Sequence, residues 1–463
     1  MRRLLALILL AIAWPAAAQE AVEVSVTRQG ERWTAEYRFA GRVPAWLFVR
    51  SALTVSGEAP WRPQSWRVET PGVRLARRGH HDVLESTDGR PLPAVVRIAF
   101  TPFSRDLIAD YDPALVFTDG SVALYSEQFV AFPLASAEEA EDLPRDLNGI
   151  DFPEVATRLT FRDARGEVLH GGRRLAQAQV LDDDGDGTYV LFGPARPIVT
   201  DAMAAVIDLE LPQWIRAALV RSVPDIMARY AAALGPAPGP VPTIFVSWAG
   251  PTPSLLSMGG STLQGMIVMT YEGEGVLQEN RDARHGGLWF IAHEAAHFWL
   301  GNAVHYQYSR EAWITEGGAD LLAIRMVAAV DPTYDPRAAL NRSIAECAGL
   351  IEGRGVESAE QRNEHRAYYA CGAVFGLAAE SASRRPFIEI VRALVDANRA
   401  DGILSRAEWL AALDRAAGDR GLSRAIAHLL DDGAEDPGEA IADLFTRAGI
   451  AFTRGEDGVP VLS

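Results

Sequence analysis

The stretch HEAAHFWLGN, residues 293–302, decides the fold of this chain. His293 and His297 are four positions apart, and nearly all residues around them are apolar. The longer segment GGLWFIAHEAAHFWL, residues 286–300, is apolar on almost every helical face, which predicts a buried helix. On such a helix the two histidines share one face, about one turn apart.

Two imidazoles and a carboxylate on a buried helix are costly without partners, and a metal ion would supply the partner. Zinc accepts histidine nitrogen, and the spacing lets both rings reach one ion. Glu294 would then lie beside the open coordination position, where it can take a proton from the attacking water. The alternative is a buried helix that happens to carry two histidines, so a third ligand is required.

The segment REAWITEGGADLLAIRMV, which begins at residue 310, offers that ligand. Its helical periodicity places Glu316 and Asp320 on one face, and eighteen residues separate His297 from Glu316. Glu316 is the natural third ligand, and Asp320 could accept the N–H of a ligand histidine and fix its tautomer. Gly317-Gly318 costs about 1 kcal/mol per glycine in a helix, which close approach of the two helices would offset. The competing interpretation is a solvated acidic face, which the apolar neighbours disfavour.

Together these segments resemble the gluzincin metallopeptidases of the aminopeptidase N type. That family pairs HExxH with a glutamate at the same separation, with Gly-Asn after the first helix and Trp before the Glu-Gly. The resemblance covers about residues 200–400 and implies a thermolysin-like catalytic domain that holds one Zn²⁺ ion. By position it implies zinc ligands at His293, His297 and Glu316, a general base at Glu294, and a supporting aspartate at Asp320.

A downstream segment, YYACG at residues 368–372, resembles the family's Tyr-x-Lys-Gly motif, whose tyrosine hydrogen-bonds the oxyanion. Tyr369 and Gly372 fit the motif, while Cys371 replaces its lysine. Oxyanion stabilisation by a phenol is chemically reasonable. Tyr369 is therefore the second candidate catalytic residue, and Tyr368 is its rival.

Upstream, MGGSTLQGMIVM at residues 258–269 occupies the place of the family strand whose glutamate binds the substrate's α-amine. Aligning Gly259 and Gly265 puts Thr262 at the position of that glutamate. A glycine-containing strand edge can still hold an extended peptide by backbone hydrogen bonds, so these three residues are candidate substrate-binding residues. The amine anchor itself is missing, although nearby Glu272 or Glu274 could substitute.

The pattern along the chain predicts an α+β multidomain protein. Residues 19–197 alternate apolar and polar positions, as in AVEVSVTRQGERWTAEYRF, which predicts a β-sandwich-like domain. A mainly helical, thermolysin-like zinc peptidase domain is expected over 198–390, followed by a short helical region over 391–463. The stretch STLQGMIVMTYEG is expected to form a single strand.

One motif in the β-rich part imitates a calcium loop without completing it. LDDDGDGTYVLFG supplies Asp182, Asp184, Asp186 and Gly187, but Gly193 occupies the twelfth position, where an EF-hand requires glutamate. A solvated Asp-Gly turn between strands is the better interpretation.

The first residues, MRRLLALILLAIAWPAAAQE, have the charged, apolar and small-residue regions of a secretory signal, which predicts cleavage after residue 18 and a periplasmic or secreted protein. The apolar run is too short to span a bilayer, and no later stretch is apolar enough.

Cys347 and Cys371 could form a disulfide in an oxidising compartment, or remain buried thiols in separate helices. The net charge of −17 argues against nucleic acid as a partner.

These observations favour a zinc metallopeptidase that acts on peptides and lacks the usual amine-anchoring glutamate. Whether it is an aminopeptidase or an endopeptidase stays open, as does its oligomeric state. The alternative function is a zinc-containing protein that binds peptides without cutting them. A different hydrolytic reaction on the same scaffold, such as epoxide opening, has no positive sign in the sequence.

Overall fold

The computed structural model describes residues 22–463, apart from 109, 146, 148–154, 183–186, 240, 363 and 419. The chain forms two compact units whose segments alternate along the sequence. Unit 1 extends to Pro113 and includes Tyr125–Gly166 and Ala176–Asp186, while unit 2 takes Ala114–Leu124, Glu167–Leu175 and Gly187–Ser463. The predicted signal peptide, and Asp184 and Asp186 of the acidic loop, lie outside the described residues. The domain bounds at 197 and 390 stay predictions.

Unit 1 is built from a six-stranded sheet, ordered β14-β11-β1-β2-β7-β4, and a four-stranded sheet, ordered β10-β3-β6-β5. The strands are β1 Val22–Gln29, β2 Arg32–Arg38, β3 Ala45–Phe48, β4 Trp66–Val68, β5 Val73–Arg78, β6 His81–Ser86, β7 Val95–Phe100, β10 Ala131–Leu134, β11 Thr157–Asp163 and β14 Ala178–Asp182. Short helices are α1 Arg62–Ser65 and the 3₁₀ turns η1 Ser126–Phe129 and η2 Glu138–Glu141.

Aromatic side chains join the two sheets of unit 1. Phe48 of β3 meets Trp66 of β4 with ring centroids 5.3 Å apart, and Phe39, just after β2, stacks on Trp46 of β3 at 4.3 Å. Along β1 the side chains alternate between buried and exposed, as the sequence pattern predicts. The expected β-sandwich-like fold of this part of the chain is confirmed.

Unit 2 contains two five-stranded sheets, ordered β13-β12-β15-β9-β8 and β16-β17-β18-β20-β19, and the terminal hairpin β21-β22. Their strands are β8 Ala114–Val116, β9 Val122–Tyr125, β12 Val168–His170, β13 Arg173–Leu175, β15 Tyr189–Phe192, β16 Ile198–Val199, β17 Ala204–Ile207, β18 Thr243–Trp248, β19 Ser257–Leu263, β20 Met266–Glu272, β21 Phe452–Arg454 and β22 Pro460–Leu462.

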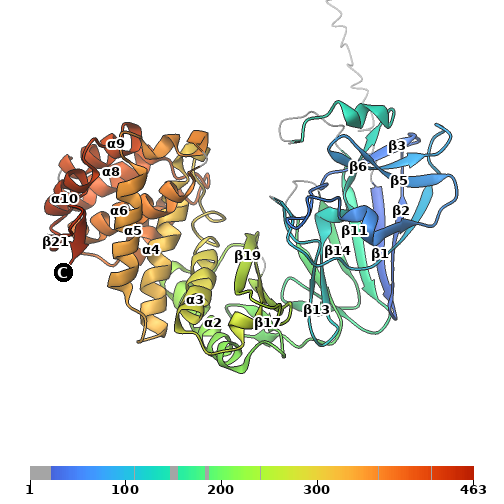
Figure 1. Ribbon diagram of the computed structural model, residues 1–463, viewed down its shortest axis with the longest axis horizontal. Coiled ribbons are helices and arrows are strands. Elements are labelled where there is room, and N and C mark those ends of the chain that lie inside the picture. The colour runs from blue at the N-terminus through green and yellow to red at the C-terminus, as the bar shows by residue number, and fades with distance from the viewer. Residues whose placement is uncertain are drawn as a thin grey trace, which may run out of the picture. The chain divides into compact units, whose positions relative to one another are not determined.

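The remainder of unit 2 is helical (Figure 1). The helices are α2 Gln213–Leu234, α3 Arg281–Ala296, α4 Trp313–Val330, α5 Pro336–Leu350, α6 Arg366–Ser383, α7 Phe387–Asn398, α8 Arg406–Ala417, α9 Gly421–Asp431 and α10 Pro437–Ala448, with 3₁₀ turns η3 Glu274–Val276, η4 Ser309–Glu311, η5 Val356–Ser358 and η6 Glu360–Arg362. Helix α4 packs against both α3 and α6, and α5 packs against α6. Among the described residues, no helix combines the length and the apolar character needed to cross a bilayer.

The prediction that STLQGMIVMTYEG forms a single strand is wrong, because the segment folds into two strands of a hairpin. β19 and β20 pair antiparallel, with Leu263 opposite Met266. Gly265 lies in the tight turn between them with a φ of 68°, a left-handed conformation that glycine adopts without strain. The alternation of the two strands runs through the turn in the sequence, so periodicity alone does not reveal the reversal.

Cys347 of α5 and Cys371 of α6 form a disulfide bond, which decides between the two alternatives left open by the sequence. Both residues are fully buried in the helical core. The bond fixes α6 to α5 at the segment that carries Tyr369. Cys371, which stands where the family motif has a lysine, therefore has a structural role in this chain.

Replacing both cysteines by serine is expected to destabilise the protein by roughly 3 kcal/mol, because a bond across this sequence separation restricts the unfolded chain. Denaturant unfolding followed by circular dichroism measures the change. Added reductant should shift the unfolding midpoint of the wild-type protein to that of the Cys347→Ser/Cys371→Ser variant and leave the variant unchanged. Equal midpoints for the oxidised wild type and the variant would contradict the prediction.

Candidate active site

Two adjacent helices bring three potential metal ligands together. His293 lies in the last turn of α3, His297 is its C-cap, and Glu316 lies in the first turn of α4. The two histidine Nε2 atoms are 3.1 Å apart, and Oε2 of Glu316 is 3.4 Å from each of them. Within the described part of the chain, these residues form the group whose ligand atoms could hold one ion.

The spacing of these three atoms fits zinc. Ligand atoms at about 2.0–2.2 Å from a tetrahedral ion are roughly 3.3–3.6 Å from one another, close to the three separations observed. The His297 and Glu316 side chains are 14 % and 23 % exposed, whereas His293 is 4 % exposed. The site is therefore closed on the His293 side and open to solvent on the other, which leaves room for a fourth ligand.

Both imidazoles are held with Nε2 free to coordinate. Nδ1 of His297 donates a hydrogen bond to the carbonyl oxygen of Leu300 at 2.8 Å. Nδ1 of His293 lies 2.8 Å from Oδ1 of Asp320, one turn after Glu316 on α4. A carbonyl oxygen only accepts, and a carboxylate beside Nδ1 favours a proton there, so each ring in its neutral form carries its lone pair on Nε2.

The electrostatics of the cluster favour a cation. Burial lowers the pKa of His293, but Asp320 and Glu316 outweigh it and raise the pKa to about 10. Burial also raises the pKa of Glu316, but hydrogen bonds to His293 and His297 outweigh it and hold the pKa well below its ordinary value. The cluster therefore retains a proton on His293, and a divalent cation would replace that proton.

Glu294, the predicted general base, has an unexpected partner. Thr262, on β19, donates a hydrogen bond from Oγ1 to Oε2 of Glu294. The residue that stands in place of the family's amine-binding glutamate thus contacts the carboxylate beside the metal ligands. Nothing in the sequence indicated this contact, because it joins residues that are distant along the chain.

The alternative anchors lie at the other end of the hairpin. Glu272 is opposite Ser257 and accepts a hydrogen bond from Thr252. Ser257 and Thr262 are five positions apart on β19, roughly 17 Å along an extended strand. Glu274 accepts a hydrogen bond from the amide of Ser254, in the loop before β19. Both side chains are therefore engaged with that loop.

The other candidate substrate residues, Gly259 and Gly265, have different settings. β19 is the edge strand of its sheet, and a Cβ placed on Gly259 would meet nothing within 4 Å. Gly259 therefore leaves open space along an edge whose backbone can pair with an extended peptide. The conformation of Gly265 is explained by the hairpin turn.

Of the two candidate tyrosines, Tyr369 is the one at the metal ligands. Its ring stacks on His293 with centroids 5.6 Å apart. Burial, together with the negative charge of Glu316, raises the pKa of Tyr369 above its ordinary value, so the phenol keeps its proton as a donor. Tyr368 is buried, and its hydroxyl accepts a hydrogen bond from the amide of Glu360 at 3.3 Å.

Glycines set the approach of α6 to α4. A Cβ on Gly317 would lie 2.2 Å from the Cα of Gly372, and a Cβ on Gly372 would lie 2.2 Å from the carbonyl oxygen of Trp313. A Cβ on Gly318 would lie 2.8 Å from Leu300, just after α3. At Gly318 the close contact is with the turn that follows α3, and at Gly317 it is with α6, which brings Tyr369 to the cluster.

Sequence reasoning missed two further side chains at the site. Trp289 contacts the ring of His293 with centroids 5.3 Å apart, and the guanidinium of Arg366 lies 5.1 Å from the ring centroid of Tyr369. Helical spacing could have predicted both contacts, since Trp289 precedes His293 by four residues and Arg366 precedes Tyr369 by three.

No protein-family model and no curated protein sequence matches the chain. Solved structures do match. An aminopeptidase N family protein from Idiomarina loihiensis superposes with a TM-score of 0.60 at 12 % identity, covering 91 % of this chain and 78 % of that one. Leukotriene A4 hydrolase from Saccharomyces cerevisiae gives 0.48 at 11 % identity, covering 90 % and 68 %. An M1 zinc metallopeptidase from Deinococcus radiodurans gives 0.42 at 15 % identity, covering 89 % and 93 %.

The similarity to the Idiomarina protein extends over most of both chains, at an identity too low to indicate more than a common architecture. The other two TM-scores are below 0.5 and add nothing to it. The sequence motifs and the superposition nevertheless point the same way. This chain therefore has the fold of the aminopeptidase N family, the family that its HExxH motif and Glu316 resemble.

Proposed function

We propose that this protein is a zinc-dependent metallopeptidase that hydrolyses peptide bonds. The observation that carries the proposal is the triangle of His293 Nε2, His297 Nε2 and Glu316 Oε2, with sides of 3.1, 3.4 and 3.4 Å. These residues would hold one Zn²⁺ ion. Glu294, which follows the first ligand in the chain, supplies the carboxylate needed for proton transfer.

When bound, zinc acts as a Lewis acid that makes water a better nucleophile and polarises the substrate carbonyl. Glu294 accepts the proton of the attacking water and delivers it to the leaving nitrogen. Thr262 donates to one oxygen of Glu294, which orients the carboxylate and leaves the other oxygen for proton transfer. Tyr369, a protonated phenol beside His293, donates a hydrogen bond to the oxygen that gains negative charge.

The substrate is a peptide bound in extended form along the open edge of β19. Support comes from the edge position of that strand and the open space at Gly259. Thr262 is uncharged and engaged with Glu294, so it offers no carboxylate to an N-terminal ammonium group. We therefore propose that a free N-terminus is not required, which separates this chain from typical aminopeptidases.

Export to the periplasm or the exterior stays a prediction of the N-terminal pattern. The buried Cys347–Cys371 disulfide supports it, since such bonds persist mainly in oxidising compartments.

The variant Glu294→Gln is expected to bind one zinc ion per chain like the wild type while losing peptide hydrolysis by about 100-fold or more, because an amide cannot accept the proton. The glutamine oxygen still accepts from Thr262, so the local structure is preserved. Zinc is counted by elemental analysis and hydrolysis is followed by mass spectrometry on a mixed peptide library.

Retained hydrolysis by the zinc-loaded Glu294→Gln protein would overturn the mechanism. A fully zinc-loaded wild type that binds the library peptides and cuts none of them would instead identify a zinc-containing peptide-binding protein.

Tyr369→Phe is expected to lower kcat by about 100-fold with little change in KM, since the phenol hydrogen bond strengthens only as the oxyanion develops. Tyr368→Phe is the matched control, because the hydroxyl of Tyr368 is hydrogen-bonded to the amide of Glu360 and the variant's activity should stay near wild type. Steady-state kinetics on one good substrate compare the two. The roles are reversed if Tyr368→Phe is the impaired variant.

N-terminally acetylated peptides are expected to be cut nearly as fast as the same peptides with a free amine, with kcat/KM values within about tenfold. A charged hydrogen bond to the ammonium group would have been worth roughly 10- to 100-fold. Paired peptides of identical sequence, free and acetylated, are compared by liquid chromatography. Cleavage of the free peptides alone would show that another group anchors the amine.

A further inference from the structure

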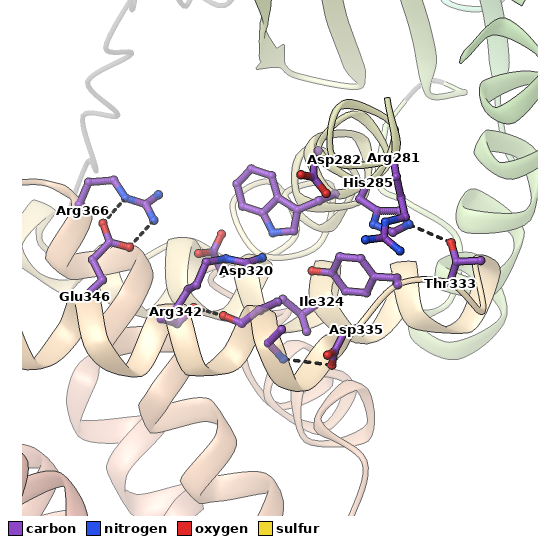
Figure 2. Close-up of a pocket in the computed structure, with 16 residues that line it drawn as sticks. Arg281, Asp282, His285, Asp320, Ile324, Thr333, Asp335, Arg342, Glu346 and Arg366 are labelled. Atoms are coloured by element: carbon purple, nitrogen blue, oxygen red, sulfur yellow. Dashed lines mark hydrogen bonds and ion pairs between the residues drawn. The ribbon is translucent and has the colours of Figure 1, made fainter. Parts of the chain in front are cut away.

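A cavity of about 890 Å³ lies next to the candidate active site and has no role in the steps above. Its walls come from α3, α4, α5 and the first turn of α6 (Figure 2). It shares Asp320 and Trp289 with the surroundings of His293, since both side chains line the cavity and contact that ring. Anything bound in it therefore lies close to the bond being cleaved.

Two arginines on the cavity wall have no partner among the residues that the structure describes. Figure 2 shows Arg281 of α3 and Arg342 of α5 extending into the same space. Within the described part of the chain, neither guanidinium makes an ion pair or a hydrogen bond, and both side chains are exposed at the mouth. They are available to a ligand.

Most acidic groups on the wall are already engaged. Asp320 lies against Nδ1 of His293, and Glu346 makes a bidentate pair with Arg366 at 2.9 and 2.8 Å. Asp335 caps α5 by accepting the amide hydrogens of its second and third residues. Asp282, in the first turn of α3, follows Arg281 in the chain and partly offsets its charge. Arg342 is therefore the cation of the wall whose charge is least compensated by a neighbouring carboxylate.

The helices add to this demand. Helices α3 and α6 begin at Arg281 and Arg366 on the cavity wall, and α5 begins just after Asp335. The first turns of α3 and α6 therefore line the cavity and add partial positive charge to its wall, whereas the start of α5 is capped by Asp335. An arginine in the first turn of a helix is electrostatically unfavourable, and an anion between the helices would compensate for it.

Uncharged donors complete the lining. Burial raises the pKa of Tyr334 to about 12 despite the opposing charge of Arg342, so its phenol stays protonated and can donate. Burial lowers the pKa of His285, whose Nε2 is 3.1 Å from Oγ1 of Thr333. The cavity thus offers donors on several sides. Planar guanidinium groups match carboxylates in shape and charge.

We propose that this cavity binds a carboxylate of the peptide substrate, with Arg342 as its principal partner and Arg281 and Tyr334 as further donors. The proposal rests on the proposed peptidase function. The carboxylate can come from an acidic side chain near the scissile bond or from the C-terminus of a short peptide. Both sources present the same group to Arg342, and substrates separate them.

The experiment compares matched tripeptides. One arm uses amidated tripeptides that carry Glu or Gln at one position at a time, and the other uses a neutral tripeptide as free acid or amide. Wild-type kcat/KM should favour the carboxylate member of at least one pair by about 10- to 100-fold, as expected for a charged hydrogen bond. Arg342→Gln should abolish that preference, mainly through KM, and leave the neutral peptides unchanged.

Two variants control for structure. Arg337→Gln removes an exposed arginine from the same helix, outside the cavity wall, and should keep the preference. Arg342→Lys should restore part of it, because the charge returns without the planar fork. Equal rates for both members of every wild-type pair would overturn the proposal. So would an Arg342→Gln variant that slows all peptides alike.

Binding of the same peptides to the zinc-loaded Glu294→Gln protein, measured by calorimetry, separates the two proposals. Carboxylate-dependent binding that Arg342→Gln removes, without hydrolysis by the wild type, would sustain the cavity's role and refute the peptidase. Hydrolysis by the wild type with no dependence on a carboxylate would support the peptidase and refute the proposed role of the cavity.

Discussion

The constraint on which the rest depends is the close placement of two imidazoles, one of them buried, among three carboxylates where α3, α4 and α6 meet. Such a cluster is stable only if every charge has a partner. His293 is paired with Asp320, and His297 donates a hydrogen bond to the carbonyl oxygen of Leu300. Oε2 of Glu316 lies 3.4 Å from Nε2 of each histidine. Nε2 of His293, Nε2 of His297 and Oε2 of Glu316 therefore form a triangle that could coordinate a divalent cation.

The glycine contacts and the disulfide serve this arrangement. Gly317 and Gly372 allow α4 and α6 to approach so closely that no side chain fits between them. The Cys347–Cys371 bond then ties α6 to α5, the helix that carries Arg342. The metal-ligand cluster and the neighbouring cavity are thus fixed by the same helices, so the proposed carboxylate site keeps a constant position relative to the proposed reaction centre.

The sequence predicted what depends on local spacing and little else. The intervals between His293, His297 and Glu316 determine which side chains share a helical face, so these residues and the sandwich-and-helices fold were accessible. The reversal at Gly265, the contact of Thr262 with Glu294 and the arginine-lined cavity join segments distant in the chain. No periodicity records such contacts, and two cysteines alone cannot reveal whether their helices are neighbours.

X-ray absorption at the zinc edge, combined with metal counting, tests the central claim most directly. The account predicts one zinc ion per chain, with two imidazole nitrogens and carboxylate oxygen at about 2.0–2.2 Å, and loss of that signal in His297→Ala. Zinc well below one ion per chain, or a spectrum without imidazole scattering, would contradict it.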